Sequence, residues 1–136
     1  MPRYNKNNIK DLKAFLYNSC IHDAKIENIR YDCKEDIIKI ELFNTFFDVR
    51  MELIFLDIRV ALKIKGDWSE NRGTILSLTA EDDFSDLQNS LSEHSEYLND
   101  SLYLMFQMFS GDELHIVSKE VIIERVLSAQ NNEFIY

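Results

Sequence analysis

Between Tyr31 and Glu81, apolar and polar side chains alternate in one stretch after another, and this pattern constrains the fold more than any other feature of the chain. The clearest stretch is 57–65, where apolar residues (Ile58, Val60, Leu62, Ile64) alternate with charged ones (Asp57, Arg59, Lys63, Lys65). Successive side chains of a strand point to opposite faces, so the pattern predicts a sheet with one buried and one solvated face. One-sided burial is typical of antiparallel sheets.

Other alternating stretches predict the remaining strands. These cover residues 26–33 with a bulge near Asn28, then 38–42, 49–64, 76–80, 102–108 and 114–117. We expect residues 49–64 to form one long bulged strand, because the phase of alternation slips at Leu56-Asp57 and Asp57 alone is a poor hairpin loop. Within residues 119–127, the β-branched content of Val121 to Val126 favours a strand, and an amphipathic C-terminal helix is the alternative.

Two segments have helical periodicity. Residues 8–19 place Ile9, Leu12, Phe15 and Leu16 on one face, and a second helix is expected near residues 84–98. The sequence therefore predicts one α+β domain spanning residues 1–136. Its sheet, or flattened β-sandwich, should be antiparallel, with about six or seven strands and these two helices. The expected core is Ile38, Ile40, Leu42, Leu53, Phe55, Val60, Leu62, Leu78, Leu104 and Phe106.

The net charge of −9 and the pI of about 4.7 argue against nucleic acid and anionic membranes as partners, since both are negatively charged. The chain has no Gly-rich phosphate loop, and no apolar run approaches the roughly 20 residues that span a bilayer. The polar start, from Met1 to Lys6, lacks the apolar core of a secretory signal. We therefore expect a cytoplasmic protein whose two cysteines are reduced.

An acidic cluster offers one candidate surface for a protein partner. Glu81, Asp82, Asp83 and Asp86 lie within six positions and precede the second expected helix, where carboxylates favour the helix N-terminus. The cluster lacks the Gly and Glu of a calcium-binding EF-hand loop. We interpret it as a solvated helix start that can also contact a basic protein. Trp68, in the polar turn 66–73, is either a core residue or an interface anchor.

His22-Asp23, together with His115, forms the second candidate site. An Asp beside a His can orient the imidazole or share a metal, but adjacent strand residues point apart, so the pair needs a turn to cooperate. Cys20, His22, Cys33 and His115 lack the paired Cys spacing of structural zinc sites. We expect a structural role for the pair, no metal or other cofactor, and no enzymatic activity.

The stretch from Ile21-His22-Asp23 through Ile26, Ile29, the Ile38/Ile40/Leu42 strand, Phe55 and Trp68 resembles small uncharacterised bacterial domains. These open with an apolar-His-Asp triplet and continue as β-strands, and some are grouped with toxin-immunity proteins. The resemblance covers roughly residues 21–80 and implies a non-catalytic β-rich domain. It carries over no functional residues.

The leading expectation is therefore a non-catalytic cytosolic domain that binds another protein, such as an immunity-type inhibitor of a basic toxin. The first alternative is a small-molecule-binding or enzymatic domain with its site near His22, Asp23 and His115. The second alternative is a homodimeric structural module that pairs exposed strand edges.

Overall fold

The structure, a computed structural model, describes residues 3–18, 21–64, 74–81, 100–109 and 111–126. Its strands are β1 (Arg3–Asn5), β2 (Lys25–Asp32), β3 (Ile37–Asn44), β4 (Val49–Ile64), β5 (Ile75–Glu81), β6 (Leu102–Met108) and β7 (Glu113–Val126). A short 3-10 helix η1 (Lys6–Asn8) leads into the helix α1 (Ile9–Asn18). The predicted antiparallel sheet and N-terminal helix are thus confirmed. The second helix expected near residues 84–98 lies outside the described residues.

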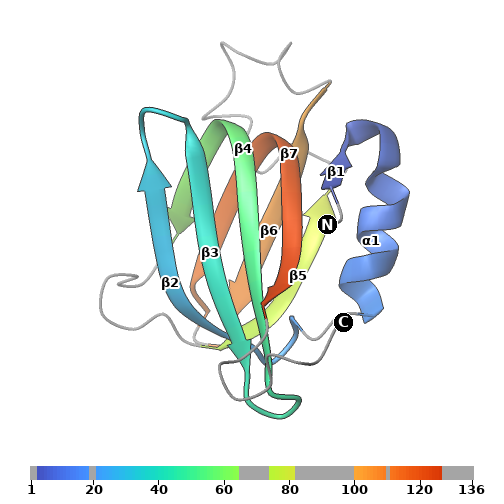
Figure 1. Ribbon diagram of the computed structural model, residues 1–136, viewed down its shortest axis with the longest axis vertical. Helices are drawn as coiled ribbons and strands as arrows, with labels where there is room; N and C mark the ends of the chain where they lie inside the picture. The colour runs from blue at the N-terminus through green and yellow to red at the C-terminus, as the bar shows by residue number, and fades with distance from the viewer. Residues whose placement is uncertain (1–2, 19–20, 65–73, 82–99, 110, 127–136) are drawn as a thin grey trace.

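The strands form one continuous seven-stranded antiparallel sheet in the order β2-β3-β4-β7-β6-β5, and β1 pairs with the C-terminal part of β7. The sheet curls, so β5 and β6 lie behind the layer that β3, β4 and β7 present to the viewer (Figure 1). Its two ends meet at one corner, where the amide of Asp23 donates to the carbonyl of Ile75 at 2.9 Å and the amide of Ile75 donates to that of Ala24 at 2.8 Å.

The phase slip in the sequence corresponds to a bulge in β4. Asp57 has a φ of 57°, and the register with β7 shifts between Ile58 and Val60. The residues before the bulge pair with β3 and the C-terminal part of β7, whereas those after it pair with the N-terminal part of β7. The predicted long bulged strand is confirmed, and so is the predicted bulge near Asn28, where the β2–β3 register shifts. Residues 121–126 continue β7 as a strand.

Helix α1 lies beside β5 and β1 (Figure 1). Its periodicity explains the packing, because Leu12 is fully buried and Phe15 packs on Tyr4 with ring centroids 6.1 Å apart. The Asn5 and Asn8 side chains form a reciprocal capping box just before the helix.

The core lies inside the curled sheet, and Phe55 and Phe106 meet there edge to face at 6.3 Å. The predicted core residues that can be assessed are all buried, namely Ile38, Ile40, Leu42, Leu53, Phe55, Leu78, Leu104 and Phe106. The side chains of Val60 and Leu62 lie outside the described part of the chain. At β6 and β7 the second face is also buried, since Tyr103 and Val117 alternate with core residues yet are inaccessible to solvent. One-sided burial therefore does not hold along the whole sheet.

Candidate functional site

Most of the predicted acidic docking surface lies outside the described residues. The residues of this predicted surface that lie outside the described ranges are Trp68, Asp82, Asp83 and Asp86. Glu81 is described, at the end of β5, where its carboxylate accepts a hydrogen bond of 2.9 Å from the Thr79 hydroxyl. A docking role for this cluster stays a prediction.

His22 and Asp23 do lie in a turn, which allows their side chains to meet. The distance from His22 Nε2 to Asp23 Oδ1 is 3.5 Å, and Asp23 has a φ of 71°. His22 is exposed and its ring lies 6.2 Å from that of Phe109. The turn is fastened to the neighbouring β3–β4 turn by Asn44, whose amide donates to the carbonyl of His22 at 3.3 Å.

The structure places His115 in another environment. Its side chain is almost fully buried, with Nδ1 2.5 Å from the Tyr103 hydroxyl and Nε2 3.0 Å from Glu113 Oε1. Because a carboxylate accepts, Nε2 donates to Glu113, and in the neutral imidazole the Tyr103 hydroxyl therefore donates to Nδ1. The Tyr103 and Glu113 side chains thus give both nitrogens of the buried imidazole a hydrogen-bond partner, as a structural histidine requires.

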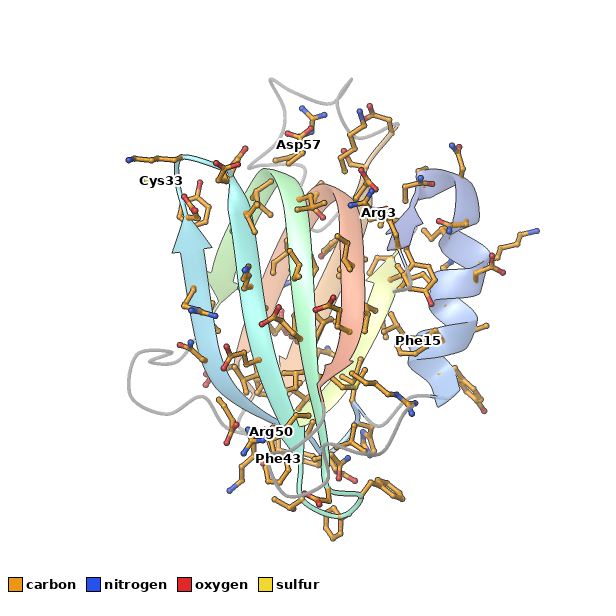
Figure 2. All side chains as sticks on the ribbon, viewed as in Figure 1. Arg3, Phe15, Cys33, Phe43, Arg50 and Asp57 are labelled. Atoms are coloured by element: carbon orange, nitrogen blue, oxygen red, sulfur yellow. The ribbon has the colours of Figure 1, made fainter. Side chains whose placement is uncertain are left out.

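The residues weighed above as zinc ligands and described by the structure, His22, Cys33 and His115, are not brought together. Across the described residues, no group of three or more His, Cys, Asp or Glu side chains is placed to hold a metal ion. Cys33 is a free, exposed thiol at the β2–β3 turn, and Cys20 lies outside the described residues (Figure 2).

A small cavity lies beside His22, between the C-terminal half of α1 and β5. Its volume is about 290 Å³, and it combines apolar walls from Leu16, Ile21 and Leu78 with the polar side chains of Lys13 and His22. The size is near the lower end of small-molecule sites, which span roughly 300–1,000 Å³.

A third surface was not found by the sequence analysis. It is the outer face of β3, β4 and β7, meaning the side chains that alternate with the buried ones on these strands. The register places Glu41 opposite Glu52, and Glu52 opposite Glu124. We call these three glutamates the acidic row. The row runs perpendicular to three neighbouring strands. The backbones that carry successive glutamates are therefore about 4.8 Å apart.

The acidic row is only partly neutralised. The Arg30 guanidinium donates to Glu41 Oε1 at 3.0 Å. Within the described part of the chain, Glu52 and Glu124 make no ion pair or side-chain hydrogen bond. Like charges directly opposite on neighbouring strands destabilise a sheet, so the arrangement lowers the stability of the fold.

Two positive charges flank the row on the same face: Lys39, two residues before Glu41 on β3, and Arg50, two residues before Glu52 on β4. Arg50 stacks on the ring of Phe43, with its guanidinium carbon 4.4 Å from the ring centroid, and pairs with Glu27. Figure 2 shows Phe43 and Arg50 together at the end of the sheet opposite Cys33 and Asp57.

Apolar side chains lie beside the acidic row on the same face. Ile54 pairs with Ile122 in the next outward row, and Ile37 pairs with Leu56 in the row beyond. We call these four residues the apolar patch. Ile37, Ile54 and Leu56 are half-buried and Ile122 is buried, and no described helix covers this layer (Figure 1). The register also places Lys39 opposite Ile54 and Glu120 opposite Leu56, so both rows beside the acidic row mix apolar and charged side chains.

One end of the sheet also remains open for pairing. β2 ends the strand order, and no described strand other than β3 pairs with its residues 27–32. Homodimerisation through a strand edge stays a prediction.

No family model matches the chain, and no curated protein or solved structure is significantly similar to it. No helix in the described ranges is long and apolar enough to cross a membrane.

Proposed function

We propose that this chain binds another protein, of net positive charge, through the outer face of β3, β4 and β7. The observation that carries the proposal is the acidic row, in which Glu52 lies between Glu41 and Glu124 on neighbouring strands. A sheet that served only its own stability would not gain from this arrangement. A basic partner converts the repulsion into attraction on binding.

The apolar patch contributes affinity that charged groups alone do not supply. Charged groups steer encounter and select partners, whereas apolar area removed from water provides much of the affinity. Interfaces commonly combine an apolar centre with a polar border. The patch and the acidic row lie in adjacent rows, so one partner can cover both.

A basic toxin is the partner class that the resemblance to immunity-type domains suggests, and the net charge of −9 supports it. In this proposal the protein is a non-catalytic inhibitor that covers a basic surface of its target. Its acidic field raises the association rate.

The test is affinity capture from extracts of the source cells with matched baits. The baits are the wild-type protein, Glu52→Lys on the outer face and Glu35→Lys on the exposed β2–β3 turn. The proposal expects a basic protein that is retained by wild type and by Glu35→Lys but lost by Glu52→Lys. Equal retention by all three baits, an acidic partner, or no partner that depends on Glu52 would overturn it.

The cavity beside His22 favours a second candidate, a site for a small carboxylate with an apolar body. The probe is 1-anilinonaphthalene-8-sulfonate, whose fluorescence rises in apolar sites. We expect saturable binding by the wild-type protein that is lost when Ala80→Phe fills the cavity. Binding that persists in this variant would contradict the candidate.

A further inference from the structure

We propose that this chain forms a homodimer in which β2 pairs antiparallel with β2 of a second copy, with Ile29 opposite its counterpart. The homodimer is independent of the proposed function, since it uses the edge of the sheet and not its outer face. Its basis is what lies beside each end of the sheet and the order of residues along β2.

The two end strands of the sheet differ in what lies next to them. β5 ends the strand order on one side, and α1 packs beside it (Figure 1). β2 ends the order on the other side, and among the described residues only Thr74 bridges to its edge, at Lys25. Residues 27–32 therefore keep a row of backbone N–H and C=O groups that no described strand pairs, and such a row is a template for another strand.

This edge carries few of the features that keep strand edges apart. Soluble proteins commonly protect open edges with Lys, with Pro or with a bulge. Residues 27–32 contain neither Lys nor Pro, and the bulge lies at their start. The strand as a whole is neutral, because its two basic side chains balance its two acidic ones, although the chain carries a net charge of −9. A second copy therefore meets less repulsion at β2 than the net charge implies.

Antiparallel pairing about Ile29 makes the edge complementary to itself. Residues directly opposite one another share a face of the sheet, so Arg30 of one copy lies opposite Asn28 of the other. The extra residue of the bulge, Glu27, lies on the same outward side, where it pairs with Arg50. Each Arg30 therefore approaches a Glu27 of the second copy, and the two-fold axis repeats the contact.

Both charged side chains are accessible for this contact. The Arg30 side chain is 59% exposed although it pairs with Glu41 at 3.0 Å, and the Glu27 side chain is 39% exposed. A guanidinium has five N–H donors, so Arg30 can bond to two carboxylates at once. On the opposite face, Ile29 is half-buried against the core and would meet its own counterpart, which extends the apolar surface across the contact.

Two other symmetric registers are less favourable. Centring the pair on Arg30 places two guanidinium groups opposite one another, and like charges in that position repel. Centring it on Tyr31 leaves only residues 30–32 of each strand to pair, since β2 ends there. Pairing about Ile29 engages residues 27–31 of both copies.

Sedimentation equilibrium at physiological salt tests for the dimer. We expect a monomer–dimer equilibrium whose dissociation constant rises about tenfold in Arg30→Glu and in Glu27→Arg, and returns towards that of wild type in the double variant. The double variant loses the contacts with Glu41 and Arg50 within the chain, so its recovery reports a contact between copies. Lys34→Glu makes the same change of charge as Arg30→Glu on the adjacent turn and should not weaken the dimer.

Disulfide cross-linking tests the register in a chain whose Cys20 and Cys33 are replaced by Ser. Ile29→Cys should give a covalent dimer under mild oxidation, because directly opposite Cα atoms are about 4.5–5.5 Å apart and disulfides need about 4.4–6.8 Å. Tyr31→Cys should not, because the two copies of residue 31 would lie about 14 Å apart.

Recovery in the double variant together with a disulfide at position 29 would support the dimer. A chain that stays monomeric up to about 1 mM would overturn it. So would a dimer that Arg30→Glu leaves unchanged or that the double variant fails to restore, or a Tyr31→Cys chain that cross-links faster than Ile29→Cys.

Discussion

Replacing Glu52 by Gln should stabilise the protein, although no packing contact is gained. The side chain lies between Glu41 and Glu124 on the neighbouring strands, with carboxylates about 5 Å apart if they follow the typical cross-strand distance. Two unit charges at this distance in water repel by about 0.8 kcal/mol. Screening over a Debye length of about 8 Å reduces this to about 0.4 kcal/mol for each neighbour.

Glu41 repels Glu52 less than Glu124 does, because Arg30 already pairs with Glu41. We therefore expect Glu52→Gln to raise the free energy of unfolding by about 0.4–0.8 kcal/mol. Glu52→Lys should also raise it, but by less than twice as much, since the new cation attracts both glutamates and is repelled by Arg50 on the same face. The control Glu35→Gln removes a charge from the exposed β2–β3 turn and should not stabilise.

The assay is urea denaturation, because guanidinium chloride would itself screen the charges. It is run at low salt and at 1 M NaCl, where the Debye length falls to about 3 Å and most of the gain should disappear. A Glu52→Gln protein that is no more stable than wild type, or a gain that salt leaves unchanged, would refute the view that the row is repulsive.

Three further predictions follow from other described contacts. Tyr103→Phe should destabilise by about 1–3 kcal/mol in urea denaturation, because His115 Nδ1 loses its buried donor, and an unchanged midpoint would contradict the hydrogen bond. Asp57→Gly should be neutral or stabilising and Asp57→Val should cost about 1–2 kcal/mol, because a β-branched residue disfavours the positive φ at this position; equal stability of the two would contradict that backbone conformation. Burial, and then the nearby charge of Asp11, raises the pKa of Tyr4 above its usual value of 10.0. Tyrosinate is thus favoured in the unfolded state, so stability should fall as the pH rises above about 10, and Tyr4→Phe should reduce this fall.

Local patterns in the sequence predicted the strands because the alternation of apolar and polar residues along a strand reflects which of its faces is buried. The phase slip at Leu56-Asp57 correctly indicated a bulge rather than a turn, and Asp is among the few residues that tolerate the positive φ found there. The β-branched run from Val121 correctly indicated a strand. The sequence also carried a signal that was not used: residues 102–106 are all apolar or aromatic, as expected of a strand buried on both faces.

The acidic row could not be predicted in the same way. Glu41, Glu52 and Glu124 each read as an ordinary outward charge on a half-buried strand. They become a site only through the order β3-β4-β7 and the register between these strands. Strand order depends on long-range pairing, and a single strand's alternation does not specify its neighbours. The sequence therefore predicted a docking surface at a cluster of neighbouring residues, 81–86, instead.

The central claim is that the outer face of β3, β4 and β7 recognises a basic partner. It is tested most directly by the association rate constant of the captured partner with Glu52→Lys, measured at low and at physiological salt. The account predicts that this rate falls several-fold below that of wild type at low salt, and that the difference narrows as salt screens the field. The association rate constant of Glu35→Lys should fall less. An association rate that Glu52→Lys leaves equal to that of wild type at both salt concentrations would contradict the claim.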